Sequence, residues 1–256
     1  VPTLIQEPNA FAGLANKWLG NQVDKICVAF TGMGKFFPEE KLVITGNPVR
    51  EEMLTRVRSS AETRAKRTGS LAEQREVLLM GGSGGARSLN EAMRDSTEQL
   101  RARPQVQWTW QCGKFYYDAF KDCASAQLPN VTISAFIDDM ETAYTKADIV
   151  IGRAGSTTIA EIQFLGKPTI LVPSPWVAED HQTMNAKALT EENAAVLVAD
   201  KDTKAKLVST VFDLLDDTDQ LQRLSDNAMA MAQTGAVTRI AREVLNLISS
   251  PQKATA

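Results

Sequence analysis

The 256-residue chain contains a single histidine, His181, so histidine-based catalytic and metal sites have little to be built from. A nucleophilic serine needs a base beside it, and any imidazole acid or base in this chain must be His181. Ser83 and Ser156, which lie in glycine-rich segments, have no second histidine to activate them. One histidine and scattered thiols also give no ligand cluster for zinc. We therefore expect neither a catalytic triad nor a metal centre.

Cysteine and long apolar runs are also scarce. Cys27, Cys112 and Cys123 are odd in number and lack CxxC spacing, which favours reduced, buried thiols over disulfides or a zinc knuckle. The longest apolar stretch without a charge, residues 168–178, is broken by three prolines. It is shorter than the roughly 20 residues that cross a bilayer. The sequence thus excludes a membrane-spanning protein.

The chain has no excess of positive charge. Lysine and arginine total 28 against 31 for aspartate and glutamate, which gives a net charge of -3. No global positive field is available to collect nucleic acid or anionic lipid, so we expect no nucleic-acid partner, and any anion must be held by a local site. With 43% hydrophobic residues, the chain is long enough for a sizeable core in one large or two smaller domains.

Short apolar strands alternate with segments that favour helix. We expect strands at residues 1–6, 25–30, 42–45, 77–80, 106–111, 131–134, 149–151, 169–172 and 195–198. We expect helices at 11–19, 50–67, 86–101, 115–124, 140–146, 158–165, 182–192, 203–215, 221–233 and 237–247. This alternation predicts an α/β fold with a doubly wound domain, in which ligands bind beyond the carboxyl ends of the strands. The loops to inspect follow Met80, Ser134, Ile151 and Val172.

The first motif, Gly81–Ala86, directly follows the strand at 77–80 and opens a helix. Glycines let backbone N–H groups approach an anion closely, and a helix N-terminus adds unpaired donors, so a diphosphate fits there. The motif is neither GxGxxG with a following acidic residue nor GxxxxGK[ST], which weakens dinucleotide-redox and ATPase interpretations. A tight turn that binds nothing remains the alternative.

The second motif, residues 152–161, is again a strand end, a turn of small residues and a helix. Thr157 and Thr158 are suited to cap this helix or to donate to a phosphate. Glu161 lies one turn further on, where a carboxylate would accept hydrogen bonds from the vicinal hydroxyls of a ribose. The alternative is that Glu161 only complements the positive end of the helix dipole.

The third motif, residues 173–186, is a proline-stiffened loop that leads into a helix. It contains His181, and a lone histidine at a helix start is more often a hydrogen-bonding or packing residue than a base. The side chains of His181, Gln182 and Asn185 are instead suited to sugar hydroxyls.

Six segments carry a resemblance to a known family: residues 6–19, 46–50, 81–90, 136–140, 153–161 and 179–186. In this order they resemble the MurG family, the bacterial N-acetylglucosaminyltransferases that convert lipid I to lipid II in peptidoglycan synthesis. The similarity extends over nearly the whole chain, and residues 172–182 are most similar to Bacteroidetes-type members.

The resemblance implies a GT-B glycosyltransferase fold, in which two Rossmann-like domains face a cleft, with no obligatory metal or other cofactor. Residues 1–48 would be a remnant of the N-terminal acceptor domain, and 49–235 a nearly complete C-terminal UDP-GlcNAc-binding domain. Residues 236–256 would form a helix that crosses back toward the N-terminal domain, followed by a tail.

The glycine-rich loop that the family carries near its N-terminus is absent, and with it roughly the first third of a typical member. That loop is implicated in acceptor diphosphate binding and base catalysis, so no catalytic residue is assigned in this chain. We therefore expect this chain alone to be inactive or nearly so.

The family's diphosphate contacts fall on the first glycine motif. By motif position, backbone amides of Gly82, Ser83, Gly84, Gly85 and Ala86 would hold the diphosphate. Arg50 would supply a compensating cation, and Ile137 would lie against the uracil.

The remaining family contacts fall on the second and third motifs and on the first domain. The resemblance assigns nucleotide contact to Ser156, Thr157 and Thr158, and ribose contact to Glu161. It assigns GlcNAc contact to His181 and Gln182, and a sugar contact from the first domain to Asn9. His181 stands where some members have glutamine, which keeps a side chain that can donate and accept.

The reaction implied is inverting transfer of GlcNAc from UDP-GlcNAc to the C4 hydroxyl of MurNAc-pentapeptide-diphosphoryl-undecaprenol. The implied partners are UDP-GlcNAc and this lipid I acceptor, at the cytoplasmic face of the bacterial plasma membrane with peripheral association. Two alternatives stay open: a GT-B glycolipid synthase that uses UDP-galactose or UDP-glucose, and a non-catalytic UDP-sugar-binding module. A UDP-GlcNAc epimerase shares the architecture, but the acid and base side chains that it needs are not found here.

Overall fold

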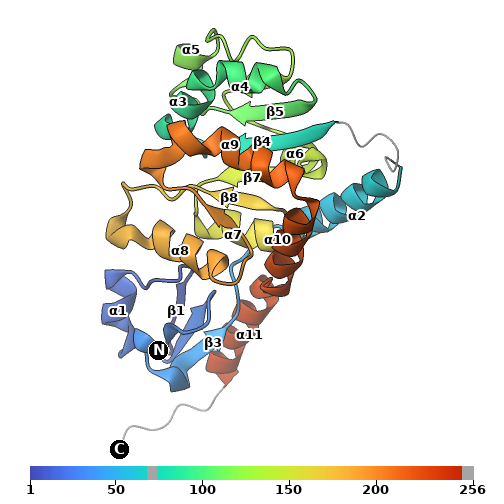
Figure 1. Ribbon diagram of the computed structural model, residues 1–256. Coiled ribbons are helices and arrows are strands. Elements are labelled where there is room, and N and C mark those ends of the chain that lie inside the picture. The colour runs from blue at the N-terminus through green and yellow to red at the C-terminus, as the bar shows by residue number, and fades with distance from the viewer. Residues whose placement is uncertain (68–73, 250–256) are drawn as a thin grey trace, which may run out of the picture.

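The computed structural model describes residues 1–67 and 74–249, which form two parallel sheets, one below the other (Figure 1). The smaller sheet contains β1 (Leu4–Glu7), β2 (Lys25–Val28) and β3 (Leu42–Ile44). The larger contains β4 (Arg75–Met80), β5 (Val106–Gln111), β6 (Val131–Ser134), β7 (Ile149–Gly152), β8 (Thr169–Leu171) and β9 (Val196–Leu197). The expected α/β architecture is confirmed.

The strand order of the larger sheet is β6-β5-β4-β7-β8-β9, and every pairing in it is parallel. The chain begins at the centre with β4, moves outward through β5 to β6, and then returns to β7 on the other side of β4. In doubly wound sheets the crevice at this reversal is where ligands bind. The loops after β4 and β7 are therefore the ones that flank the switch point.

Strands β4 and β7 at the centre of the larger sheet are apolar over residues 77–80 and 149–151 because helices cover both faces of the sheet. Val77 and Leu79 of β4 join a core cluster with α3 (Arg87–Asp95) and α9 (Thr203–Asp216). Leu78 points to the opposite face and packs with α2 (Glu51–Arg67) and α6 (Met140–Lys146). Burial on both faces explains why β4 appears as an uninterrupted apolar run instead of an alternating one.

The smaller sheet has its own core, which includes Ile26, Val28 and Phe37. The last helix, α11 (Ala236–Ser249), runs back past β3 (Figure 1). Burial raises the pKa of the Cys27 thiol in β2, and the Glu243 carboxylate of α11 raises it further, which places that helix beside the sheet.

The other helices connect and cover the strands. They are α1 (Leu14–Gly20), α4 (Thr97–Ala102), α5 (Tyr117–Phe120), α7 (Ser156–Leu165), α8 (His181–Thr190) and α10 (Thr218–Ala230), with short 3-10 turns at Met33–Lys35, Glu39–Lys41, Ala178–Asp180 and Asp200–Asp202. Most predicted helices are confirmed with ends that shift by a few residues. Helix α10 begins three residues earlier than expected because the Asp217 side chain accepts a hydrogen bond from the Gln220 N–H at 2.8 Å and caps it.

Two predicted helices were wrong in extent. The single helix expected at 86–101 is two helices, α3 and α4, which are separated at Ser96 because Asp95, Ser96 and Thr97 are poor formers of helix interiors. The helix expected at 115–124 is only the four-residue α5, since the polar segment that follows it folds into turns.

The cysteines and the surface agree with the composition. All three cysteines are free, with Cys27 and Cys112 buried and Cys123 half-buried. No helix in the described part of the chain is both long and apolar enough to span a membrane.

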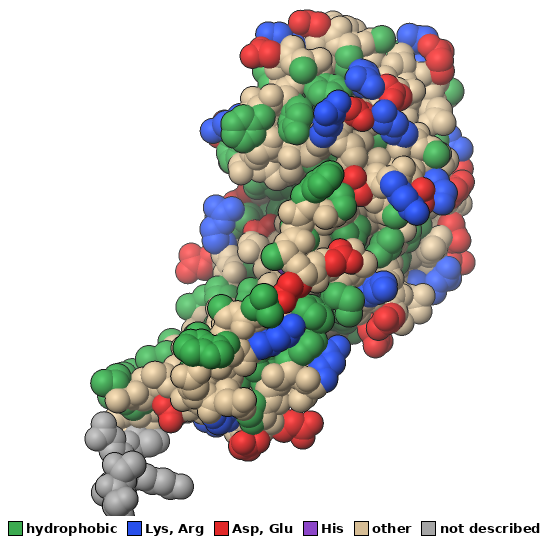
Figure 2. Space-filling model, turned by 90° about the vertical axis from the view of Figure 1, so that its left-hand side faces the viewer, with side chains coloured by type: hydrophobic (Ala, Val, Ile, Leu, Met, Phe, Trp, Pro, Cys, Tyr) green, Lys and Arg blue, Asp and Glu red, His purple; other side chains and the backbone are tan. Residues whose placement is uncertain are grey.

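Figure 2 views the face that carries α1 and α8, where hydrophobic side chains gather toward the narrow end. On α1, Leu14 and Trp18 are 71% and 70% exposed.

Candidate functional site

The turn between β4 and α3 needs glycine at Gly82 for its backbone conformation, and at Gly85 for both its conformation and its close packing. Gly82 and Gly85 have φ of +79° and +86°, and the Gly85 N–H donates to the Gly82 carbonyl at 3.0 Å. A Cβ on Gly85 would meet the Cys112 carbonyl oxygen at 2.1 Å. The turn therefore packs directly against the loop after β5. The Gln111 side-chain amide at the end of β5 donates to the Gly82 carbonyl at 2.9 Å.

The turn leaves backbone donors at the start of α3 without side-chain caps. Helix α3 begins at Arg87, one residue later than predicted, so Ala86 is the N-cap residue. The Ala86 side chain makes no capping hydrogen bond. Gly82 and Ser83 are exposed, while Gly84 and Gly85 are half-buried. Exposed glycine backbone followed by an uncapped helix N-terminus is suited to an anion.

The second turn is built in the same way. Gly155 is the N-cap of α7, with φ -71° and ψ 145° and no side-chain capping bond. Ser156 is already the first helical residue, so Thr157 and Thr158 lie within the first turn and neither caps the helix as expected. A threonine caps from the residue before the helix, and the helix begins too early for that. Both glycine turns therefore present open helix N-termini beside the switch point.

The two turns are tied together by Arg153, whose guanidinium points into the protein. It donates to the Val172 carbonyl at 3.0 Å, to the Asp200 carboxylate at 2.5 Å and to the Ser88 hydroxyl at 3.0 Å. The Ser88 hydroxyl in turn donates to Asp200 at 2.5 Å. Arg153 is therefore occupied in joining α3, β8 and the segment before α9, and its charge is paired.

Replacing Ser88 with alanine should destabilise this network modestly. A lost hydroxyl in a partly buried network costs about 1 kcal/mol, which corresponds to a fall in melting temperature of about 2–4 °C for a chain of this size. Differential scanning calorimetry measures the change. Ser209→Ala is the matched control, because its exposed hydroxyl contacts only the Lys206 carbonyl on its own helix. Equal melting temperatures for both variants would contradict the assigned role.

Glu161 lies half-buried on α7, with Tyr144 of α6 behind it. The Tyr144 hydroxyl donates to Glu161 Oε2 at 2.8 Å. Burial raises the pKa of Glu161, while the Tyr144 hydrogen bond and the positive charge of Arg50 oppose that rise. Arg50, Tyr144 and Glu161, which come from three separate segments, are thereby gathered at one place.

His181 and Gln182 begin α8 in a loop that contains unusual backbone. Glu179 and Asp180 have φ of +56° and +51°, a conformation that costs a non-glycine residue about 1–3 kcal/mol. His181 Nδ1 lies 2.8 Å from the Ala178 carbonyl oxygen, and Gln182 Oε1 accepts from the Ser174 N–H at 2.8 Å. One end of each side chain is thus used to shape the loop, which leaves His181 Nε2 and Gln182 Nε2 as the groups for a ligand.

Asn185 was expected to face a sugar, and that expectation is wrong. Its side chain is fully buried and donates to Asn9 Oδ1 at 2.9 Å and to the Ala154 carbonyl at 3.1 Å, while it accepts from the Ala10 N–H at 2.8 Å. Asn185 therefore joins the smaller sheet to α8. Asn9, also held by the buried Glu7 carboxylate at 3.2 Å, is placed at this junction.

Ile137 and Arg50 border the site from the other side. Ile137 follows β6 and packs against the cluster that contains Tyr144, while its neighbour Phe136 is 42% exposed. Arg50 precedes α2 and forms no salt bridge with any carboxylate of the described residues. The Arg50 guanidinium lies close enough to Glu161 for its charge to act on that carboxylate, and without a salt bridge among the described residues it suits an anionic ligand.

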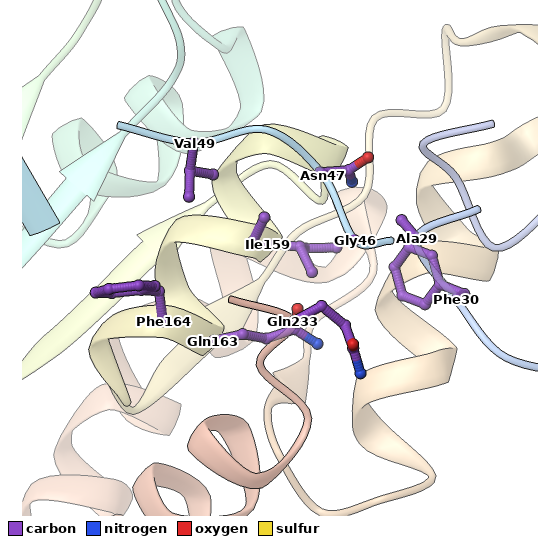
Figure 3. A pocket seen from close by; sticks show the side chains of 10 residues that line it. Ala29, Phe30, Gly46, Asn47, Val49, Ile159, Gln163, Phe164 and Gln233 are labelled. Atoms are coloured by element: carbon purple, nitrogen blue, oxygen red, sulfur yellow. The ribbon is translucent and has the colours of Figure 1, made fainter. Parts of the chain in front are cut away.

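A separate pocket lies at the junction of the two sheets (Figure 3). It is lined by residues after β2 and β3, by α7 and by the segment before α11: Ala29, Phe30, Gly46, Asn47, Val49, Ile159, Ala160, Gln163, Phe164 and Gln233. None of the predicted site residues lines it.

Sequence reasoning missed four residues that shape this site: Ser88, Tyr144, Asn185 in its observed role, and Asp200. No local pattern marked Ser88, Tyr144 or Asp200, and the third motif suggested a different role for Asn185. Each of the four acts through a partner in another segment of the chain. Among residues 1–67 and 74–249, no three histidine, cysteine, aspartate or glutamate side chains gather as a metal ion would require.

Comparison with known proteins gives consistent similarities. The family model for the glycosyltransferase family 28 C-terminal domain matches residues 76–242. A UDP-N-acetylglucosamine-N-acetylmuramyl-(pentapeptide) pyrophosphoryl-undecaprenol N-acetylglucosamine transferase from Parabacteroides distasonis is 45% identical over 97% of this chain and 67% of its own length. A protein of the same name from Porphyromonas gingivalis is 41% identical over 99% of this chain and 67% of its own length.

A solved structure gives the same similarity. The crystal structure of Acinetobacter baumannii MurG matches with a TM-score of 0.77 and 30% identity, over 96% of this chain and 68% of that chain. The chain thus spans about two thirds of the length of the relatives that it matches.

Proposed function

Because the chain belongs to the MurG family within glycosyltransferase family 28, we propose that it binds UDP-GlcNAc as a glycosyl donor. The relatives' names contain N-acetylmuramyl-(pentapeptide) pyrophosphoryl-undecaprenol, and we propose this molecule as the acceptor. In the proposal its C4 hydroxyl receives GlcNAc, and the product enters peptidoglycan synthesis. Residues 49–235 act as the donor-binding domain and 1–48 belong to the acceptor side. The reaction requires no obligatory metal.

One observation carries this proposal: two glycine turns with open helix N-termini flank the switch point, with Glu161 on the second helix. Donors from the turn at Gly82–Ala86 suit the diphosphate, and a carboxylate one helical turn away suits the ribose hydroxyls. His181 Nε2 and Gln182 Nε2 have no hydrogen-bond partner among the described residues and suit the hydroxyls of the sugar. The Asn9 side chain is used by Asn185 and Glu7, so Asn9 supports the site at the junction with the smaller sheet.

In the proposed reaction the acceptor oxygen attacks the anomeric carbon of GlcNAc, and the bond from that carbon to the phosphate oxygen breaks. The electron pair of that bond leaves with UDP, and the hydroxyl proton passes to a base. The backbone N–H groups of Gly82, Ser83, Gly84 and Ala86 and the Arg50 guanidinium offset the charge that develops on the diphosphate, while the Gly85 N–H closes the turn by donating to the Gly82 carbonyl. Such preorganised donors lower the barrier by several kcal/mol in enzymes generally.

The undecaprenol in the relatives' names places the acceptor at a membrane, so we propose peripheral association. The exposed side chains of Leu14 and Trp18, four residues apart on α1, support this because apolar groups on one helix face favour an interface. Flotation with anionic phospholipid vesicles tests the association, and equal binding by Trp18→Ala would contradict the role of α1.

The donor is tested by calorimetric titration of the chain with UDP-GlcNAc and UDP-galactose, each with and without EDTA. We expect UDP-GlcNAc to bind at least about tenfold more tightly, since a hydroxyl of the wrong configuration leaves polar groups of the site unpaired. EDTA should change neither affinity. Equal affinity would favour the glycolipid-synthase alternative, and no binding by a folded sample would contradict a donor site.

Catalysis needs its own measurement, because binding alone also fits a non-catalytic UDP-sugar module. The assay follows transfer of labelled GlcNAc to lipid I. Because this chain alone is expected to be nearly inactive, the assay is run with and without the N-terminal third of a relative supplied. Formation of labelled lipid II in the supplemented sample supports the transferase, and its absence in both samples supports the binding module.

A further inference from the structure

The Glu161 carboxylate has one hydrogen-bond partner among the described residues, and that partner is rigidly held. The Tyr144 hydroxyl donates to Glu161 Oε2 at 2.8 Å. The Tyr144 side chain is only 1% exposed and packs in a cluster with Leu54, Leu78 and Phe164. Packing on all sides fixes the ring, so the direction from which its hydroxyl reaches Glu161 is fixed as well.

A carboxylate without such a partner is free to rotate. The terminal torsion of glutamate is broad and roughly two-fold, so an unrestrained carboxylate samples many orientations. A hydrogen bond to Oε2 selects one of them and leaves Oε1 without a partner among the described residues. A carboxylate oriented in advance loses less entropy when a ligand hydroxyl binds to it.

We propose that Tyr144 is a positioning residue that holds the Glu161 carboxylate ready to accept hydrogen bonds from the ribose hydroxyls of the nucleotide. This inference rests on the proposed function, because it takes Glu161 as the group that contacts the ribose. Tyr144 itself does not touch the ligand. It sets the orientation of the residue that does.

Charge gives the hydrogen bond a second effect. The charged and titratable groups that act on Glu161 are Tyr144 from α6 and Arg50 from the segment before α2. Burial raises the pKa of Glu161, and the Tyr144 hydrogen bond lowers it. Without the tyrosine hydroxyl the pKa rises further. A smaller fraction of Glu161 is then ionised at mildly acidic pH, and a protonated carboxyl accepts hydrogen bonds less well.

The test compares UDP with 2′-deoxy-UDP in wild type and in Tyr144→Phe, which keeps the ring and removes the hydroxyl. We expect the wild type to prefer UDP. In Tyr144→Phe this preference should fall by about three- to tenfold, while the affinity for 2′-deoxy-UDP changes less than about twofold. The pH below which UDP binding is lost should also move upward in the variant. Tyr117→Phe is the matched control, because the half-buried Tyr117 forms no hydroxyl hydrogen bond with any residue in the described part of the chain.

The outcomes separate the two proposals. A wild type that binds UDP and 2′-deoxy-UDP equally would remove the ribose role of Glu161, and the role of Tyr144 with it. If wild type and Tyr144→Phe prefer UDP over 2′-deoxy-UDP to the same extent, and both lose UDP binding below the same pH, only the inference about Tyr144 is overturned. Equal weakening of both ligands would assign Tyr144 to structural support alone and overturn the inference too.

Discussion

Glu161→Ala is expected to weaken UDP-GlcNAc binding by about 100-fold or more. Hydrogen bonds to a charged group contribute about 1.5–3 kcal/mol each, and the proposed ribose contact makes two of them in a half-buried setting. Alanine also leaves the buried Tyr144 hydroxyl without its acceptor, which costs stability as well as affinity. Calorimetric titration with UDP-GlcNAc measures the first effect, and a thermal melt of the same sample measures the second.

Two further variants separate the chemistry from the fold. Glu161→Gln keeps an oxygen for Tyr144 but loses the charge, so it should melt close to wild type and bind about tenfold more weakly. Glu40→Ala removes an exposed carboxylate from the smaller sheet's side of the molecule and should change neither property. Wild-type affinity in Glu161→Ala would show that the carboxylate only complements the helix dipole.

Gly85→Ala is expected to disrupt the first glycine turn. Residues other than glycine pay about 1–2 kcal/mol at positive φ, and Gly85 has φ +86°. The new Cβ would also lie 2.1 Å from the Cys112 carbonyl oxygen and 2.7 Å from the Tyr116 ring. Because backbone must shift, we expect a loss of about 3 kcal/mol or more and a melting temperature lower by on the order of 10 °C.

Gly82→Ala is the matched control for that variant. Gly82 has a similar φ of +79°, but a Cβ there meets nothing within 4 Å. The free energy of unfolding of Gly82→Ala should fall only by the cost of the backbone conformation, about 1–2 kcal/mol. The difference between the two melting temperatures isolates the steric contribution of the loop after β5. Equal melting temperatures for Gly85→Ala and Gly82→Ala would show that the loop after β5 does not restrain the turn.

The strands and turns of the larger sheet were predictable because their signals are local. The unbroken apolar run at 77–80 predicted the buried strand β4. Strands β5 and β6, in which apolar and polar residues alternate, were predicted with the observed ends. Glycine-rich segments directly after β4 and β7 predicted strand-to-helix turns, and both are present. Helix ends were less predictable, since the break at Ser96 depends on competition among weak local preferences.

Side-chain roles that depend on a distant partner were not predictable. Asn185 was predicted to bind sugar hydroxyls because it lies in the third motif. Its side chain instead donates a hydrogen bond to Asn9, 176 positions away. Ser88 reaches Asp200 across 112 positions. Tyr144 carries no local signal of its contact with Glu161. In each case the donor and acceptor types were visible in the sequence, but their pairing was not.

The sequence by itself determined the alternation of strands and helices, the two glycine turns and the family, because each depends on residues close together in the chain. Only the tertiary structure decided that β4 and β7 are neighbours, which places both turns at one crevice. It also decided which polar groups are used internally and which remain open to a ligand. Those outcomes follow from the packing of helices on both faces of the sheet, which brings distant segments together and sets what each buried polar group must bond.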